Sequence, residues 1–140
     1  MSENSSKSLH RANYTEIRNK LLPKVEGIII EKVRQKIISI NKEKGFLGIY
    51  WPLSGEIDLT SLYLEFNIPC ALPACNKGGS LSYHQWTRRP LRKDPSNIPA
   101  PLDEPPLNPR ALDLILVPAI SIDLMGLRLG YGGGFFDRLR

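Results

Sequence analysis

The sequence predicts an α/β fold in a single domain, because a helical pattern at the start of the chain is followed by strand patterns and turns. Residues 9–41 carry apolar side chains at three- and four-residue spacing, which is typical of amphipathic helices. Residues 46–51 are a short β-branched and aromatic run and residues 112–118 are a short apolar run, and both are typical of buried strands. A chain of 140 residues has the size of one ordinary domain, so residues 1–140 are expected to share one core.

The N-terminal part of the chain is expected to form two amphipathic helices. Pro23 can begin the second helix, because a proline at the first helical position loses no hydrogen bond within the helix. Gly45 is expected to end the helical part. The apolar residues at helical spacing are Tyr14, Ile17, Leu21, Leu22, Val25, Ile28, Ile29, Val33, Ile37 and Ile40.

The middle of the chain is expected to form short strands and one short helix. The run FLGIYW at 46–51 predicts a strand that Pro52 ends, and the residues PLSGE then form a turn. Residues 57–66 predict a short helix, and residues 68–72 and 80–86 predict strands on either side of a CNKGG turn. The predicted order so far is helix, strand, helix, strand, strand.

The stretch from residue 87 to residue 118 holds a proline-rich segment and then an apolar run. Seven prolines occur between Thr87 and Arg110 with few large apolar side chains, which predicts an extended segment on the surface. The residues LDLILVP at 112–118 predict a strand that is buried on both faces of an α/β sheet.

The composition argues against several classes of protein. Hydrophobic residues make up 41% of the chain and charged residues 24%, which is near the globular average. The apolar runs are too short to cross a bilayer and the polar start lacks a signal-peptide core, so a cytoplasmic location without membrane contact is expected. Cys70 and Cys75 are expected to be reduced, buried or half-buried side chains. His10 and His84 lie far from each other and from both cysteines in the sequence, so no zinc site is expected.

The formal net charge of +5 raises the possibility of nucleic-acid binding. The whole excess lies in residues 1–44, which hold 10 Lys/Arg and 5 Asp/Glu, whereas residues 45–140 hold 9 of each. A basic N-terminal helix could face the phosphates of a nucleotide or of a polynucleotide. No helix-turn-helix, RNP or zinc pattern accompanies the charge, so a nucleic-acid partner is disfavoured.

A glycine-dense segment between Arg128 and Asp137 carries the strongest chemical signal in the sequence. It follows the predicted strand at 112–118 and is expected to lead into a helix that starts near Phe135. Glycines lack a Cβ atom, so their backbone N–H groups can approach phosphate oxygens closely, and a helix N-terminus adds its positive dipole. Arg128 can donate a charged fork, and Asp137 can hold the magnesium ion that accompanies a nucleoside triphosphate.

The glycines could instead form a tight turn that binds no ligand. That alternative is weaker here, because a purely structural turn has no use for the flanking Arg128 and Asp137. The segment matches neither a Walker A motif nor the dinucleotide motif GxGxxG. Its residues alone therefore indicate an anion- or nucleotide-binding loop and nothing finer.

Three blocks of the sequence resemble the 5-formyltetrahydrofolate cyclo-ligases, also called methenyltetrahydrofolate synthetases. The longest is LDLILVPAISIDLMGLRLGYGGGFFDR at 112–138, and GIYWPLSGEIDL at 48–59 is similar to the family's second block. The helix with Lys7, Arg11 and Arg18 has the spacing of the family's N-terminal phosphate-binding block. The resemblance implies a three-layer α/β/α sandwich, Rossmann-like and of the cyclo-ligase type.

The resemblance also implies an activity and its ligands. The expected reaction is ATP-dependent conversion of 5-formyltetrahydrofolate to 5,10-methenyltetrahydrofolate, with Mg²⁺ as the metal and with release of ADP and phosphate. The expected partners are these small molecules alone, bound by a monomer that contacts neither nucleic acid nor membrane.

The site residues that the resemblance implies fall into four groups. Lys7, Arg11 and Arg128 would be catalytic, because they would stabilise charge on the transferred phosphoryl group, and Asp137 would bind the metal. ATP is expected to contact Lys7, Arg11, Arg128, Leu129, Gly130, Tyr131, Gly132, Gly133, Gly134, Phe135 and Phe136. Folate is expected to contact Trp51, Glu56, Tyr131, Gly132, Gly133, Gly134 and Phe135.

Several of these assignments have a structural alternative. Lys7 and Arg11 could be solvated helix charges, and Trp51 could pack in the core at a strand end. Glu56 could cap the helix that follows it, because a carboxylate is favourable near a helix N-terminus.

The sequence departs from the family pattern at two places. His10 stands where the family usually has an apolar residue. The family continues with further strands and a late acidic residue after its glycine segment, so the domain is expected to lack its last strands. A non-catalytic nucleotide-binding remnant of the same fold therefore stays an alternative to the active enzyme.

Overall fold

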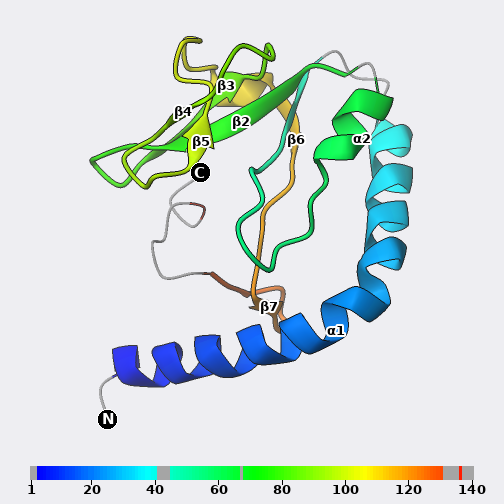
Figure 1. Cartoon of the computed structure of the whole chain (residues 1–140), viewed down its shortest axis with the longest axis vertical. Coiled ribbons are helices and arrows are strands. Elements are labelled where there is room, and N and C mark those ends of the chain that lie inside the picture. Colours follow the sequence, from blue (N-terminus) through cyan, green and yellow to red (C-terminus); the bar gives the residue numbers. More distant parts are fainter. Residues whose placement is uncertain (1–2, 41–44, 67, 131–135, 137–140) are drawn as a thin grey trace.

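The computed structural model describes residues 3–40, 45–66, 68–130 and 136. Its centre is a four-stranded mixed sheet in the order β3-β2-β1-β6 (Figure 1). Strand β1 pairs in parallel with β2 and with β6, whereas β3 runs antiparallel to β2. The strands are β1 (Phe46–Gly48), β2 (Cys70–Cys75), β3 (Leu81–Gln85) and β6 (Leu112–Ile115). A mixed sheet with helices packed around it confirms the predicted α/β class.

Strand β2 occupies the centre of the sheet because it is strongly apolar. Ala71, Leu72 and Ala74 have no exposed surface at all. The strand predicted at 68–72 lies further along the chain than expected. Pro69 has no N–H group to donate to a sheet, so the ladder begins only at Cys70. The strand predicted at 46–51 is also shorter than expected, since only its first three residues are paired.

One long helix, α1 (Glu3–Ile40), replaces the two helices that the sequence predicts. Pro23 lies inside it rather than at the start of a second helix. A proline removes one hydrogen bond and crowds the preceding turn, but the residues on either side keep their own bonds, so a helix can bend and continue. Figure 1 shows α1 turning sharply between its two halves. The predicted division into two separate helices is therefore wrong.

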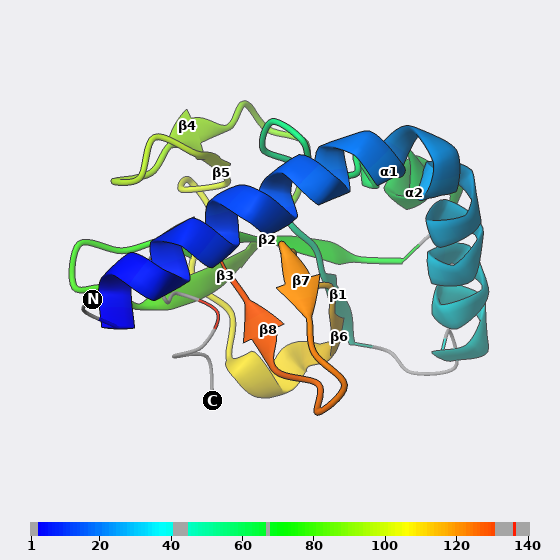
Figure 2. The same cartoon turned by 90° about the horizontal axis from the view of Figure 1, so that it is seen from below.

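The two halves of α1 have different neighbours. The C-terminal half packs on the core through Ile37, and Arg34 there forms an ion pair with Glu65 of α2 (Thr60–Glu65), with 3.1 Å between Nε and Oε1. The N-terminal half passes the hairpin that residues 121–129 form (Figure 2). In the described part of the chain, neither α1 nor α2 has an apolar stretch long enough to cross a membrane.

The proline-rich segment is more structured than predicted. It forms a small hairpin of β4 (Arg92–Lys93) and β5 (Pro99–Ala100), followed by the 3₁₀ helix η1 (Pro109–Ala111). Asp94 and Ala100 of this segment are buried. The prediction of an extended surface segment is therefore wrong for residues 92–100, because a buried carboxylate fastens their hairpin to the sheet.

Strand β6 lies at one edge of the described sheet. Asp113 on this strand is exposed, and its carboxylate accepts a hydrogen bond from the Gly45 N–H at 2.7 Å. The other residues of β6 are only half-buried. The prediction that this strand is buried on both faces is therefore wrong for the described structure.

A second small hairpin follows, made of β7 (Ser121–Ile122) and β8 (Arg128–Leu129). Its turn requires the left-handed backbone conformation of Gly126, which has a φ of 80°. Arg128 is thus placed on a strand, directly before the glycine-dense segment.

We expect Leu72→Ala to lower the free energy of unfolding by about 2–5 kcal/mol, because Leu72 is 0% exposed in the central strand and its loss leaves a cavity. The matched control is Leu64→Ala on α2, where the side chain is 67% exposed, and we expect a change within about 0.5 kcal/mol. Denaturant unfolding measures both. Equal losses from the two variants would contradict the core described here.

Candidate functional site

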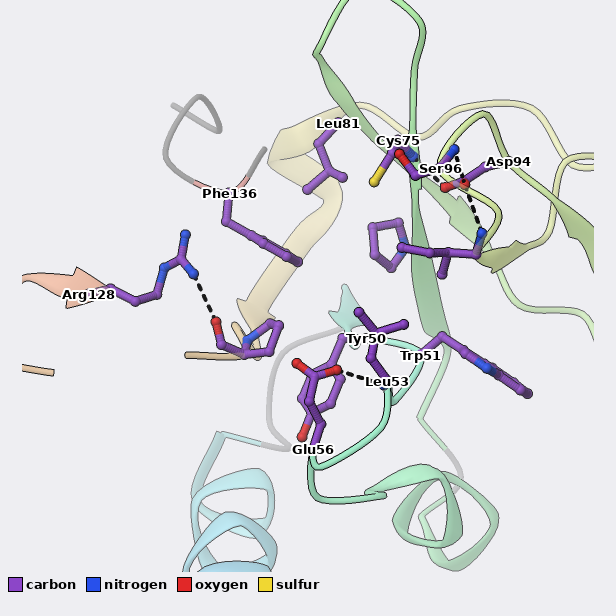
Figure 3. A pocket seen from close by; sticks show the side chains of 13 residues that line it. Tyr50, Trp51, Leu53, Glu56, Cys75, Leu81, Asp94, Ser96, Arg128 and Phe136 are labelled. Carbon is purple, nitrogen blue, oxygen red and sulfur yellow. Dashed lines mark hydrogen bonds between the residues drawn. The ribbon is translucent and has the colours of Figure 1, made fainter. Parts of the chain in front are cut away.

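A cavity of about 200 Å³ opens between the end of β1, the middle of β2 and the β4–β5 hairpin (Figure 3). Segments from very different parts of the sequence line it, so it exists only in the folded chain. The lining residues are Tyr50, Trp51, Leu53, Glu56, Pro73, Cys75, Leu81, Asp94, Ser96, Ile98, Pro118, Arg128 and Phe136. Most of these side chains are apolar, and the charged groups among them are Glu56, Asp94 and Arg128.

Four residues that the sequence assigned to two different ligands meet at this cavity. Trp51 and Glu56 come from the block at 48–59, and Arg128 and Phe136 come from the glycine-dense segment. Phe136 lies in a turn. The other predicted residues of that segment, Tyr131, Gly132, Gly133, Gly134, Phe135 and Asp137, lie outside the described residues. The helix expected near Phe135 falls on the same part of the chain.

Arg128 is held in place from two sides. Its Nη1 donates a hydrogen bond to the Pro118 carbonyl at 3.0 Å, as the dashed line in Figure 3 shows. Its guanidinium carbon lies 5.6 Å from the centre of the Phe136 ring, a distance at which the ring attracts the cation. These contacts keep a positive charge at the cavity wall.

Arg11 and Arg128 converge on Gly130. Arg11 Nε donates a hydrogen bond to the Gly130 carbonyl at 3.0 Å, although the two residues are 119 positions apart. A Cβ atom at Gly130 would lie only 2.7 Å from Arg128 Nη1, so the guanidinium occupies the space that a side chain would fill. Leu129 pairs with Ser121 in the hairpin. Lys7 is exposed and lies one turn before Arg11 on α1.

Glu56 closes the turn that the sequence predicts at 52–56. Its Oε1 accepts the Leu53 N–H at 2.7 Å, and its own N–H donates to the Leu53 carbonyl at 3.0 Å. Its Oε2 is buried and has no hydrogen-bond partner among the described residues. Helix α2 begins only at Thr60 and has no side-chain cap, so the alternative role of Glu56 as a helix cap is wrong.

Glu56 also faces a second hollow. This hollow of about 370 Å³ lies between α1 and residues 117–122 and shares Tyr50, Glu56 and Pro118 with the cavity. Its wall is mainly aliphatic and contains none of the residues of the glycine-dense segment that the structure describes. The cavity, and not this hollow, therefore brings the predicted site residues together.

Trp51 has contacts that match its structural alternative. Its ring packs edge-on against Trp86, with 6.5 Å between ring centres, and Trp86 packs in the same way against Tyr63 at 6.0 Å. In Figure 3 the indole points away from Glu56 and Tyr50. A role for Trp51 in folate binding stays a prediction.

The described residues offer no ready metal site. Within residues 3–40, 45–66, 68–130 and 136, no three His, Cys, Asp or Glu side chains are grouped as a protein-held metal ion requires. The predicted ligand Asp137 lies outside that part of the chain. The metal assignment therefore stays a prediction.

Sequence reasoning missed most of the cavity wall. Tyr50 and Leu53 stand inside the block at 48–59, so their place beside Trp51 and Glu56 was a usable signal. For Asp94 the sequence signal was weak, since the residues Asp-Pro-Ser-Asn are typical of a turn but do not indicate that the aspartate is buried. The missed residues are Tyr50, Leu53, Pro73, Cys75, Leu81, Asp94, Ser96, Ile98 and Pro118.

Both cysteines are free thiols, and both are buried, as the sequence predicted. Burial raises the pKa of the Cys70 thiol to about 11, and the positive charge of Arg88 offsets only part of this effect. Burial also raises the pKa of the Cys75 thiol in the cavity wall, and the negative charge of Asp94 adds to the shift. Neither environment resembles that of a reactive thiol, which is electropositive and partly exposed.

The sequence and the fold both match one enzyme family. Residues 3–140 match the sequence model of the 5-formyltetrahydrofolate cyclo-ligase family. The chain belongs to this family. A Caenorhabditis elegans protein named "Probable 5-formyltetrahydrofolate cyclo-ligase" is 32% identical over 124 residues, which cover 77% of this chain and 59% of that protein. This cyclo-ligase chain thus spans about three fifths of the length of the curated relative that it matches.

Two solved structures confirm the predicted cyclo-ligase fold. The solution structure of Aquifex aeolicus 5,10-methenyltetrahydrofolate synthetase is similar with a TM-score of 0.74 and 32% identity, over 95% of this chain and 71% of that one. A 5,10-methenyltetrahydrofolate synthetase from Mycoplasma pneumoniae has a TM-score of 0.69 and 18% identity, over 95% of this chain and 76% of that one. The second likeness is one of fold alone.

We expect Cys70 in this cyclo-ligase-family chain to react slowly with thiol reagents at neutral pH and faster as the pH approaches 11, where its thiolate forms. The unfolded thiol ionises at lower pH, so the free energy of unfolding should fall as pH rises from about 9 towards 11. Thiol labelling of the folded protein against pH measures the first effect, with Cys70→Ser as the control that leaves Cys75 alone. Rapid labelling of Cys70 at pH 7 would contradict its burial.

Proposed function

We propose that this chain catalyses the ATP-dependent conversion of 5-formyltetrahydrofolate to 5,10-methenyltetrahydrofolate, with release of ADP and phosphate. One observation carries the proposal. In a chain of the cyclo-ligase family, a single cavity holds both a carboxylate with an unpartnered buried oxygen, from Glu56, and a fixed guanidinium, from Arg128. These two groups suit the two substrates that such a reaction must bring together.

Glu56 suits the folate. A buried carboxylate oxygen without a partner is costly, so a ligand that donates a hydrogen bond to Oε2 would offset this cost on binding. The pterin ring of a folate carries N–H donors on one edge, and its faces are apolar. Leu53, Pro73 and Ile98 offer apolar surface for those faces in the same cavity.

Arg128 and Arg11 suit the ATP phosphates. Two guanidinium groups converge on Gly130, and each already donates to a backbone carbonyl that fixes its position. Guanidinium groups can bind phosphate oxygens in a bidentate manner, which is geometrically specific. Lys7 shares a helix face with Arg11 and extends the positive region along α1.

The reaction then needs positioning and electrostatic stabilisation. The formyl oxygen attacks the γ-phosphorus and ADP leaves, N10 attacks the activated formyl carbon and loses its proton, and the C–O bond breaks to release phosphate. Arg128, Arg11 and Lys7 would stabilise the charge on the transferred phosphoryl group. Glu56 would orient the pterin so that the formyl oxygen lies in line with the phosphorus. Magnesium would arrive with ATP and neutralise phosphate charge, and Asp137 is its predicted protein ligand.

We expect the wild-type chain to bind ATP with magnesium, and Arg128→Ala to weaken this binding by about 1.5–3 kcal/mol through loss of a charge-assisted contact. Gly130→Ala should also weaken ATP binding. The added Cβ atom would lie 2.7 Å from Arg128 Nη1 and would displace the guanidinium. Arg110→Ala is the matched control, since Arg110 lies in η1 and lines none of the cavities described. Titration calorimetry measures all four proteins.

Unchanged ATP affinity in Arg128→Ala would remove Arg128 from the nucleotide site. A folded wild-type chain that binds no ATP would overturn the proposed function as a whole. Binding of both ATP and folate without formation of the methenyl product, followed by its near-ultraviolet absorbance, would favour the non-catalytic alternative instead.

We expect Glu56→Gln to raise the KM for 5-formyltetrahydrofolate about tenfold or more, because a hydrogen bond to a charged oxygen is lost. The glutamine carbonyl can still accept the Leu53 N–H, so the turn should persist and ATP affinity should stay nearly intact. Steady-state kinetics and thermal unfolding measure these effects, with Glu65→Gln on α2 as the control. Lower thermal stability with unchanged folate affinity would show that Glu56 serves only the turn.

A further inference from the structure

Asp94 is a buried acid that the proposed reaction leaves unused. Its side chain lines the cavity, yet the residue is only 6% exposed. Burying a carboxylate is expensive unless its oxygens accept enough hydrogen bonds. A buried acid in the wall of a substrate cavity therefore needs a structural account.

Three backbone N–H groups satisfy this carboxylate. Oδ2 accepts the Cys75 N–H at 2.8 Å, and Oδ1 accepts the N–H groups of Ser96 at 2.8 Å and Ile98 at 3.0 Å. The Asp94 N–H in turn donates to the Ile98 carbonyl at 2.9 Å. The turn also contains Asn97 at a φ of 63°, a left-handed conformation that asparagine tolerates. Oδ1 thus shapes the loop 94–98, and Oδ2 fastens that loop to the end of β2.

The fastened residues form one side of the cavity. Cys75, Ser96 and Ile98 all line it together with Asp94. Figure 3 shows Cys75, Ser96 and Asp94 across the cavity from Glu56 and Arg128. The distance across the cavity at this point is therefore set by where Asp94 ties the β4–β5 hairpin to the sheet.

We infer that Asp94 is a positioning residue for the folate: it fixes the wall of loop 94–98 against which the folate is held, opposite Glu56. The inference rests on the proposed function of the cavity. Asp94 acts through the backbone of the loop, because both of its oxygens are taken up by N–H groups. Its effect falls on the folate side, since Arg11 and Arg128 are held by the carbonyls of Gly130 and Pro118, which lie outside the loop.

The test uses two variants with graded damage. Asp94→Ala removes all three acceptor contacts. Asp94→Asn keeps one acceptor oxygen for Ser96 and Ile98 but presents an NH₂ group to the Cys75 N–H, so only the fastening to β2 is lost. The matched control is Asp113→Ala, which removes a carboxylate that also joins two distant segments by accepting a backbone N–H but does not line the cavity.

The readouts are steady-state kinetics, ATP calorimetry and amide hydrogen exchange of the free protein. We expect the KM for 5-formyltetrahydrofolate to rise about 10- to 100-fold in Asp94→Ala and less in Asp94→Asn, because a misplaced wall loosens the bound substrate. ATP affinity should stay within about twofold, since its binding groups are unchanged. Exchange at Cys75 should be about tenfold faster in both variants, and exchange at Ser96 and Ile98 should be about tenfold faster only in Asp94→Ala.

Several results would overturn the inference. An unchanged KM in an active Asp94→Asn protein would do so, and so would equal losses of ATP and folate affinity. If Asp94→Ala folds only in part, the unfolded fraction lowers kcat and leaves KM unchanged, and Asp94→Asn then decides. A wild-type chain that forms no methenyl product would refute the proposed function itself, whereas an active wild type with indifferent Asp94 variants would refute only the role of Asp94.

Discussion

The backbone of β2 is largely shut off from water, so its N–H and C=O groups must find partners within the protein. Strands β1 and β3 supply most of them, and the Cys75 N–H is satisfied by the Asp94 carboxylate. Each of these partners is connected to the cavity wall. Strand β1 continues into the turn that holds Glu56, β3 begins at the lining residue Leu81, and Asp94 belongs to the lining loop 94–98. The cavity is thus a consequence of how the central strand satisfies its hydrogen bonds, and a defect in β2 should disturb several walls at once.

The positive side of the cavity depends on a different constraint. Arg11 and Arg128 both approach Gly130, and two like charges in one place repel each other unless an anion or a carbonyl dipole compensates. In the structure each guanidinium donates to a carbonyl, of Gly130 and of Pro118 respectively. Such dipoles compensate only part of the charge, so the arrangement favours a polyanion. The bend of α1, which contains Pro23, contributes to it, because its two halves pack Ile37 in the core and pass the β7–β8 hairpin in different directions (Figure 1).

The sequence predicted the α/β class, the four strands of the central sheet and the separate blocks that meet at the cavity, because these depend on local patterns and on motif spacing. It failed at Pro23, since a proline at a helix start and a proline at a bend look alike when the packing of the flanking turns is unknown. It failed at β6, because an apolar run shows that a strand is hydrophobic but not how many neighbours it has. It failed at Asp94, because the burial of an acid is decided by N–H groups that arrive from elsewhere in the chain.

These failures share a physical cause that bears on the site. Glu56 and Arg128 lie in blocks that resemble those of the family, so the identity of each side chain could be read from the sequence. The wall at 94–98 is shaped by backbone N–H groups that converge on one carboxylate, so only Asp94 itself is chemically constrained, and most of the loop leaves no mark in the sequence. Sequence analysis can therefore predict the part of a cavity that acts through side chains. It does not predict the part that is shaped by main-chain hydrogen bonds. In this chain the recognisable blocks supply the charged groups Glu56 and Arg128, and the loop 94–98 sets the width of the cavity opposite them.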